Sequence, residues 1–389
     1  MKVAIKTLGC KVNQAESDIL ATTFSREGVE VVSFGEEADL YIVNSCAVTK
    51  EAENKTRQMV NRILRNNLAP RVILTGCYAR LISQERKNPF KEPVFLLPSF
   101  PKEREILNLV EKWWGKKFPL AEYPLPPRAR AWIKVEDGCD HFCSYCLIPH
   151  LRGEVRSEEK EKIIRQAQAL EREGIREIVL CGINLGYYGK DKEGESLITL
   201  LRELLDNTSV VRFRLSSIEP FLVDEEFIER YFSLPDRVCP HFHLPLQSGS
   251  DRILKSMRRG YDAAHYRALV STLRRYSPQV AISTDIIVGF PGEEKEDFEN
   301  TVSFAQEIGF SRTHVFVFSP RPGTPAFLWE KEIGIPKTEK KNREKILREV
   351  ARENQRKYHH LFLGKKLKVL VESAQKGMGS GYSENYIPV

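Results

Sequence analysis

The sequence predicts an α/β protein with an N-terminal parallel sheet, a central incomplete parallel barrel and a short C-terminal β segment. Short apolar runs alternate with amphipathic segments over residues 1–114, a second strand–helix series covers 130–335, and a proline-rich stretch separates the two. Such alternation is typical of parallel sheets covered by helices. A doubly wound sheet remains possible for the second series.

The N-terminal series contains apolar runs that we interpret as strands. They are residues 3–5, 29–34, 40–43, 72–74 and 94–97. Charged amphipathic segments such as 49–66 lie between them and predict helices. We expect residues 1–114 to form one Rossmann-like domain. A linker over 115–129 follows, because four prolines within nine residues interrupt a helix or a central strand.

Six strand–helix units follow the linker. Their strands are predicted at 132–135, 177–180, 211–215, 242–244, 281–288 and 314–318. Helical patterns such as 157–173 and 293–308 separate them. Six such units fit a partial (β/α)6 barrel better than a sandwich, so we expect residues 130–362 to form one barrel domain.

The end of the barrel domain is a long basic helix, predicted over 338–362 with eight Lys or Arg and four Glu. Its basic residues could contact phosphate or pair with glutamates one turn away on a solvated helix. Residues 363–389 contain a predicted strand at 367–372 and a glycine-rich stretch, which leaves room for about two strands.

The composition describes a soluble globular protein of two or three domains. Of 389 residues, 41% are hydrophobic and 29% charged, which excludes a disordered or fibrous protein. No run approaches the roughly 18 apolar residues of a membrane span. A second lysine close to the start argues against a secretory signal, so we expect a cytoplasmic protein without a membrane partner. The net charge of +7 favours a polyanionic partner such as RNA.

Three cysteines far apart in the sequence, Cys10, Cys46 and Cys77, share one context, because each follows an apolar run of the N-terminal domain. The carboxyl ends of parallel strands lie at one edge of a sheet, so the three thiols could converge in one crevice. Two of them follow a glycine, which lets backbone come close to a bulky ligand. One such cysteine alone would be a packing residue, but three at matching positions favour a metal or cluster site.

Cys139, Cys143 and Cys146 form a second and sharper set with the spacing C-x3-C-x2-C. Closely spaced thiolates, usually four, hold iron–sulfur clusters, so three would leave one iron open to bind a small molecule. A structural zinc site would need a fourth ligand such as a nearby histidine. We favour a cluster, because zinc motifs commonly pair two C-x2-C elements. The remaining Cys181 and Cys239 are interpreted as packing residues.

Several motifs resemble those of a known enzyme family. C-x3-C-x2-C after the first strand of a barrel, with Tyr145 before the last cysteine, resembles the signature of radical S-adenosylmethionine enzymes. Residues 9–18, 44–49 and 75–77 look like the N-terminal domain of the methylthiotransferases. Further matches lie at 148–149, 152–153, 244–250, 257–261 and 284–293. The run GCKVNQ at 9–14 resembles the branch that acts on N6-threonylcarbamoyladenosine in tRNA.

The resemblance implies a radical-SAM partial barrel and a reaction. The second cysteine set would hold a [4Fe–4S] cluster that binds S-adenosylmethionine, and the first set an auxiliary [4Fe–4S] cluster that carries sulfur. Reduced flavodoxin or ferredoxin would donate the electron that cleaves S-adenosylmethionine to a radical. Hydrogen would then leave C2 of the modified adenosine at position 37, and a methylthio group would be inserted. The implied partners are the tRNA anticodon stem-loop and a sulfur donor.

The resemblance also implies S-adenosylmethionine contacts on the loops after successive barrel strands. These residues are Tyr145, Gly182, Asn184, Ser217, Glu219, Gln247, Ser248, Gly289 and Phe290. Each could equally be a turn or capping residue. Asp285 departs from the pattern, because many radical enzymes have glycine there. Arg258 and Arg259 could meet the cofactor carboxylate, RNA phosphate or solvent.

The C-terminal residues 363–389 resemble only the first part of the small TRAM-like β-barrel with which members of this family grip RNA; the matching motif is 381–386. Three alternatives stay open. The same chemistry could act on N6-isopentenyladenosine in tRNA. The chain could instead be a non-catalytic iron–sulfur electron carrier or RNA-binding protein, or a zinc-stabilised RNA-binding module.

Overall fold

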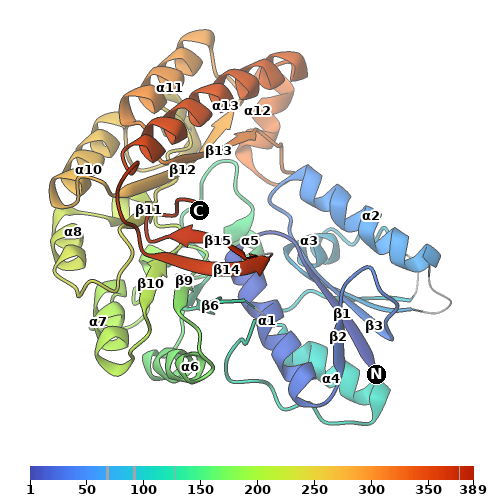
Figure 1. Cartoon of the computed structure of the whole chain (residues 1–389). Helices are drawn as coiled ribbons and strands as arrows, with labels where there is room; N and C mark the ends of the chain where they lie inside the picture. Colours follow the sequence, from blue (N-terminus) through green and yellow to red (C-terminus); the bar gives the residue numbers. More distant parts are fainter. Residues whose placement is uncertain (67–69, 91–92, 127, 376) are drawn as a thin grey trace.

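The structure is a computed structural model that describes residues 1–66, 70–90, 93–126, 128–375 and 377–389. An N-terminal α/β unit lies beside a half-open barrel of parallel strands, and a C-terminal hairpin lies near the middle of the view in Figure 1. The predicted fold class is thereby confirmed. None of the helices in the described ranges is long and apolar enough to cross a membrane.

Five strands form the N-terminal sheet in the order β2-β1-β3-β4-β5, and every neighbouring pair is parallel. They are β1 (Lys2–Thr7), β2 (Glu30–Val32), β3 (Leu40–Ser45), β4 (Arg71–Gly76) and β5 (Val94–Leu97). Each matches one of the predicted apolar runs. The central strand β3 is buried along its whole length, as expected of a parallel strand covered on both faces.

Four helices cover this sheet: α1 (Lys11–Arg26), α2 (Lys50–Asn66), α3 (Cys77–Gln84) and α4 (Glu103–Trp114). Side chains alternate along a strand, so Ile42 packs in one hydrophobic cluster and Val43 in the other. The predicted linker packs along α1. Within it, Phe118 is fully buried, with its ring centroid 5.3 Å from that of Phe24.

Six parallel strands form the barrel in chain order, as predicted. They are β6 (Arg130–Lys134), β9 (Glu177–Cys181), β10 (Arg212–Leu215), β11 (His241–His243), β12 (Ala281–Val288) and β13 (Arg312–Val317). Isolated parallel bridges, Phe213 to Val238 and Ser217 to His243, join the first three strands to the last three. The barrel is therefore one continuous series that stays open between β6 and β13.

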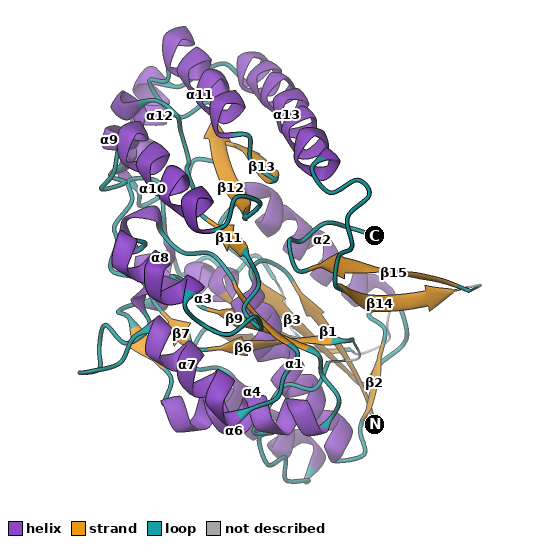
Figure 2. Ribbon diagram, turned by 60° about the vertical axis from the view of Figure 1, so that its left-hand side comes forward, coloured by secondary structure: helices purple, strands orange, loops and turns teal. Residues whose placement is uncertain are grey.

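Helices cover the outside of the barrel strands (Figure 2). They are α6 (Lys160–Arg172), α7 (Leu197–Asn207), α8 (Glu225–Phe232), α9 (Asp251–Met257), α10 (Ala263–Tyr276), α11 (Lys295–Ile308) and α12 (Pro325–Ile333). The short helix α5 (Ile148–Arg152) instead packs against α3 of the N-terminal unit. Short elements that the sequence analysis did not identify are the antiparallel pair β7 (Glu136–Asp137) and β8 (Arg156–Ser157), and the 3-10 turns Leu185–Tyr187 and Pro220–Leu222. On the open side of the barrel, α1 packs against β6.

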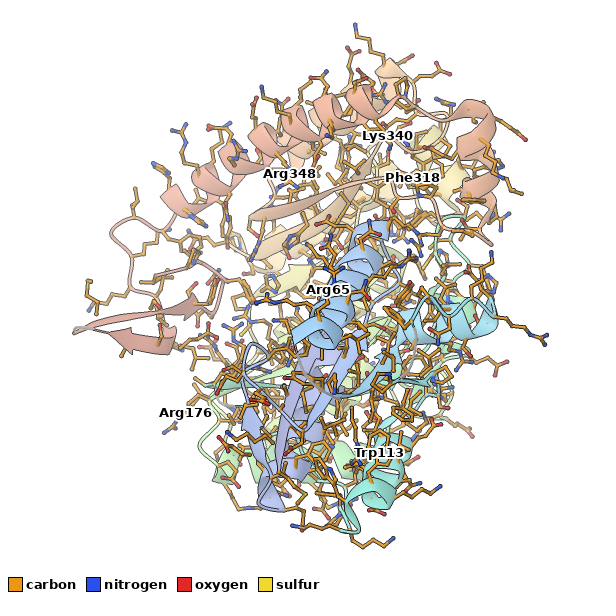
Figure 3. The ribbon with its side chains drawn as sticks, turned by 90° about the vertical axis from the view of Figure 1, so that its right-hand side faces the viewer. Arg65, Trp113, Arg176, Phe318, Lys340 and Arg348 are labelled. Atoms are coloured by element: carbon orange, nitrogen blue, oxygen red, sulfur yellow. The ribbon has the colours of Figure 1, made fainter. Side chains whose placement is uncertain are left out.

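The predicted basic helix is α13 (Lys337–His360), which packs against β13 and lies above α2 in Figure 3. Its outer face fits a solvated helix, since Arg348 pairs with Glu344 at 2.7 Å. On its inner face, however, the buried Arg343 binds Glu293 at 2.6 Å. The basic run is therefore not uniformly exposed.

The C-terminal segment forms the two expected strands, β14 (Val369–Gln375) and β15 (Met378–Ser383), paired antiparallel. An isolated hairpin is marginal in water, but this one is tied to the barrel. Arg212 donates to the Tyr382 carbonyl oxygen at 2.8 Å, and Arg214 to that of Glu384 at 2.9 Å. Both arginines also pair with the buried Glu177.

Candidate active site between two cysteine sets

The first cysteine set lies at the carboxyl edge of the N-terminal sheet. Cys10 caps the start of α1, Cys46 follows β3 directly, and Cys77 is the first residue of α3 after β4. Because β1, β3 and β4 are neighbours in the sheet, the structure brings the three thiols together, and both Cys10 and Cys77 act electrostatically on Cys46. The N-termini of α1 and α3 also place positive helix-dipole ends here.

The glycines before two of these cysteines allow a close approach of neighbouring loops. We expected Gly9 and Gly76 to let backbone come close to a ligand, and that stays a prediction. Both have positive φ, and a Cβ on Gly9 would lie 3.0 Å from the Cys46 sulfur, while one on Gly76 would lie 2.4 Å from the Ser45 carbonyl oxygen. Protein atoms fill that space, so the glycines let neighbouring loops approach and bring the cysteines together.

The second set lies on the loop between β7 and α5, where each sulfur accepts a hydrogen bond. Cys139 accepts one from the His141 backbone N–H at 3.4 Å, and Cys146 from that of Ile148 at 3.4 Å. Cys143 accepts one from the Arg259 guanidinium at 3.1 Å. Donors of this kind stabilise thiolates and adjust the potential of iron–sulfur clusters.

Burial raises the pKa of the Cys46, Cys139 and Cys146 thiols to about 12 in each case. Such thiols ionise only when a cation binds them, as in metal coordination. Within the described ranges, no group of three or more His, Cys, Asp or Glu is arranged to hold a single ion. The donor type, three thiols in each set, is the one that holds iron–sulfur clusters.

A cavity of about 190 Å³, here called the central cavity, is lined by one cysteine of the second set and by residues that directly follow Cys46 of the first set. Ala47 and Val48, which follow Cys46, line one side, and Cys146 lines another. Thr49, Phe318 and Arg321 line both this cavity and a larger groove of about 1180 Å³. A ligand could thus reach a point between both sets from outside.

Of the nine predicted cofactor contacts, Tyr145 and Gln247 line the central cavity. Tyr145 packs edge-on against Phe290, with ring centroids 6.4 Å apart, and its hydroxyl accepts a hydrogen bond from Arg259 at 3.3 Å. The guanidinium of Arg259 also binds Glu219. Of the two arginines considered, Arg259 is therefore buried among the second cysteine set, while Arg258 is exposed.

Asn184 is buried, and neither atom of its side-chain amide has a partner among the described residues. Its backbone N–H donates to Glu136 at 2.8 Å, a carboxyl whose pKa burial raises to about 9. A Cβ on Gly182 would lie 2.5 Å from the same carboxyl. The unpaired amide next to the cysteine loop is what a polar ligand would satisfy.

The remaining predicted contacts lie outside the central cavity. Ser217 is half-buried and bridges to β11. The buried Ser248 hydroxyl is 3.2 Å from that of Thr301, and the Gly289 N–H donates to Glu293 at 2.8 Å. These two groups are occupied by protein partners.

The chain is similar in sequence to known protein families over most of its length. The family model described as the radical SAM superfamily matches residues 133–305, and that described as uncharacterized protein family UPF0004 matches residues 2–96. The threonylcarbamoyladenosine tRNA methylthiotransferase MtaB of Thermotoga maritima is 41% identical over 398 aligned residues, covering 99% of this chain and 90% of that protein. The chain belongs to the radical S-adenosylmethionine methylthiotransferase family.

Other relatives of this methylthiotransferase carry a different name. The tRNA-2-methylthio-N(6)-dimethylallyladenosine synthase of Dictyoglomus thermophilum is 36% identical, covering 85% of this chain and 78% of that protein. Among solved structures, the radical S-adenosylmethionine methyltransferase TsrM of Kitasatospora setae aligns with a TM-score of 0.58 at 18% identity, covering 85% of this chain and 78% of that one. The likeness to TsrM concerns the fold alone.

A buried ion network joins the two units of the methylthiotransferase, and the sequence analysis missed it. Arg152, fully buried, binds Glu16 of α1 at 3.1 Å and Asp137 of β7 at 2.9 Å. Burial alone would raise the pKa of Glu16, but Arg152, Lys102 and Lys134 hold it well below its usual value. The family motifs contained both Glu16 and Arg152; the pairing between them could not be read from the sequence.

Arg152→Met is expected to lower the free energy of unfolding by about 3–5 kcal/mol, because it removes the fully buried guanidinium that Glu16 and Asp137 share. Lys134 still contacts both carboxylates, and Lys102 still contacts Glu16. Urea denaturation of the metal-free protein measures this. Arg202→Met, a change at an exposed position on α7, is the matched control. An unchanged urea midpoint for Arg152→Met would contradict the role of this network.

Two further groups near the central cavity were not predicted. Arg321 is 2% exposed and binds Glu53, yet its Nε and Nη1 have no partner among the described residues. Asp285, which departs from the glycine of many radical enzymes, lines the cavity and lies 3.3 Å from His243 Nε2. Only the folded barrel places these charges beside the cysteines.

Proposed function

We propose that this methylthiotransferase inserts a methylthio group at C2 of N6-threonylcarbamoyladenosine at position 37 of tRNA. The observation that carries the proposal is the central cavity, which is lined by Cys146 of the second set and by Ala47 and Val48, the residues next to Cys46 of the first set. An adenine in that cavity would lie between both sets, as a reaction that uses both requires. The name of the Thermotoga maritima relative supports this substrate.

We assign the second set, Cys139, Cys143 and Cys146, to a [4Fe–4S] cluster that binds S-adenosylmethionine, and the first set, Cys10, Cys46 and Cys77, to an auxiliary [4Fe–4S] cluster. When bound, these groups supply electron transfer for S-adenosylmethionine cleavage and the sulfur for insertion. The chain's own residues position the reactants: Tyr145 and Gln247 border the cavity, and the unpaired Asn184 amide is available to the cofactor. Arg259 places a positive charge beside Cys143.

The remaining predicted contacts, domains and partners belong to the same proposal. The proposed domains are 1–114 with the auxiliary cluster, the barrel 130–362 after the linker 115–129, and an RNA-binding segment 363–389. The proposed partners are the tRNA anticodon stem-loop, reduced flavodoxin or ferredoxin, and a sulfur donor. The basic outer face of α13 would add contacts to RNA phosphate that carry no sequence preference.

The substrate is tested by incubating anaerobically reconstituted protein with tRNAs that carry either threonylcarbamoyl or isopentenyl groups. Mass spectrometry of the digested nucleosides should find the methylthio product in the threonylcarbamoyl tRNA. Product only in the isopentenyl tRNA would establish the second candidate, which the Dictyoglomus thermophilum relative favours. Stoichiometric zinc with little iron and no 5′-deoxyadenosine would contradict both.

A further inference from the structure

A pocket of about 220 Å³, here called the basic pocket, lies beside Cys10, and its formally charged lining residues, Lys11 and Arg312, are both cations. Lys11, Arg312 and four histidines line it, and no aspartate or glutamate does so among the described residues. The histidines are His241, His243, His314 and His359; burial lowers the pKa of His241, His314 and His359, so these three offer hydrogen bonds and not charge. Such a lining suits an anion.

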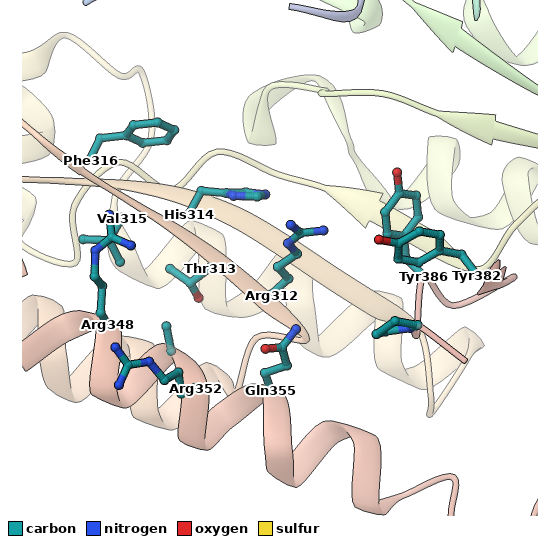
Figure 4. A pocket seen from close by; sticks show the side chains of 12 residues that line it. Arg312, Thr313, His314, Val315, Phe316, Arg348, Arg352, Gln355, Tyr382 and Tyr386 are labelled. Carbon is teal, nitrogen blue, oxygen red and sulfur yellow. The ribbon is translucent and has the colours of Figure 1, made fainter. Parts of the chain in front are cut away.

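A neighbouring pocket of about 440 Å³ extends the positively charged lining toward the surface. It shares Arg312 and His314 with the basic pocket and adds Arg348 and Arg352, again without a carboxylate among the described lining residues. Figure 4 shows β13 and α13 contributing these side chains from two sides. An anion would therefore be attracted from outside toward the basic pocket.

Lys11 is the innermost cation with no direct counter-charge. It is the first residue of α1, is half-buried, and its ammonium makes no hydrogen bond or ion pair with any described residue. Asp285 acts on it electrostatically but lies 3.3 Å from His243 Nε2. A half-buried cation without a partner costs free energy, which an anionic ligand would offset.

The basic pocket adjoins the central cavity. His243 lines the pocket, and its partner Asp285 lines the cavity, while Cys10 of the first cysteine set immediately precedes Lys11. In adenine, C2 and the carbon that bears N6 flank the same ring nitrogen. A group attached to N6 must therefore lie close to the carbon that is modified, and from the central cavity it would extend toward the basic pocket.

We propose that the basic pocket binds the carboxylate of the threonylcarbamoyl group, with Lys11 as its counter-charge and Arg312 as a second donor. The inference rests on the proposed function and names the residues that select its substrate. An isopentenyl group has no charge and would leave the ammonium unpaired, so Lys11 disfavours that substrate. Lys11 is a specificity-determining residue that acts on binding.

The test uses three anticodon stem-loop RNAs that differ only at N6 of one adenosine: threonylcarbamoyl, its methyl ester, and isopentenyl. Fluorescence anisotropy with the reconstituted full chain measures binding to each. Wild type should prefer the acid over the ester by about tenfold or more, and Lys11→Met should lose most of that preference while ester affinity stays within about twofold. Lys11→Arg should retain part of it. Lys341→Met, at an exposed position on α13, is the control.

Full acid-over-ester preference in Lys11→Met would overturn the inference. Arg312→Gln, on the exposed edge of β13, provides an independent variant if Lys11→Met fails to fold; it should show a smaller loss in the same direction, and an unchanged preference there overturns the inference equally. Failure of the proposed function looks different, because wild type itself would then modify isopentenyl RNA and not the threonylcarbamoyl RNA.

Discussion

Cys143→Ala is expected to abolish both 5′-deoxyadenosine formation and tRNA modification, a loss of at least about 1,000-fold, or roughly 4 kcal/mol in activation free energy. Cys143 is the middle cysteine of C-x3-C-x2-C, is 8% exposed, and accepts a hydrogen bond from Arg259. A cluster with one free iron and only two remaining protein thiolates would be lost or unable to hold S-adenosylmethionine in place. Anaerobic assays with dithionite measure both products.

The matched control for this change is Cys239→Ala. Cys239 is 1% exposed, just before β11, and is interpreted as a packing residue. Removing its sulfur should cost only stability, of the order of 1 kcal/mol, and leave both products. If Cys143→Ala formed 5′-deoxyadenosine at the control's rate, the second cysteine set would not hold the cofactor cluster.

The strands and the cysteine sets could be predicted because their signals are local. Apolar runs located all five strands of the first sheet and all six of the barrel, with ends shifted by at most about two residues. Since neighbouring parallel strands end at one edge, the context of Cys10, Cys46 and Cys77 was enough to bring them together. Short elements such as α5 and the β7–β8 pair carry too few residues for a periodic pattern.

Charges that meet across the fold could not be predicted. Arg152 and Glu16 are 136 positions apart, and Lys11, His243 and Arg312 come from three elements that converge only because α1 closes the open side of the barrel. On α13, Arg343 lies four residues after Glu339, a spacing that fits a solvated ion pair, and the two side chains do pair at 2.9 Å. The same Arg343 side chain is nevertheless buried against Glu293. Helical spacing shows which neighbours share a face, whereas burial depends on what packs against that face.

Cys46→Ala is expected to reduce methylthio product at least about 100-fold while 5′-deoxyadenosine formation continues. Cys46 lies between the strand ends that carry Cys10 and Cys77, and its sulfur accepts a hydrogen bond from Val48 at 3.5 Å. Its loss removes one of three thiolates from the auxiliary cluster, so iron content should fall to about half of wild type. The second set, on a separate loop, is untouched.

The two products therefore respond differently to the two cysteine variants, and this separation is what distinguishes two sites from one. Cys181→Ala controls for sulfur loss near Cys46, because Cys181 is fully buried, packs with Val12 and Ala15 of α1, and donates only to the Ile133 carbonyl oxygen. It should keep both products and full iron. A Cys46→Ala protein that still made the methylthio nucleoside at the Cys181→Ala rate would refute the auxiliary role, and one that lost 5′-deoxyadenosine as well would mean that the two cysteine sets support a single site.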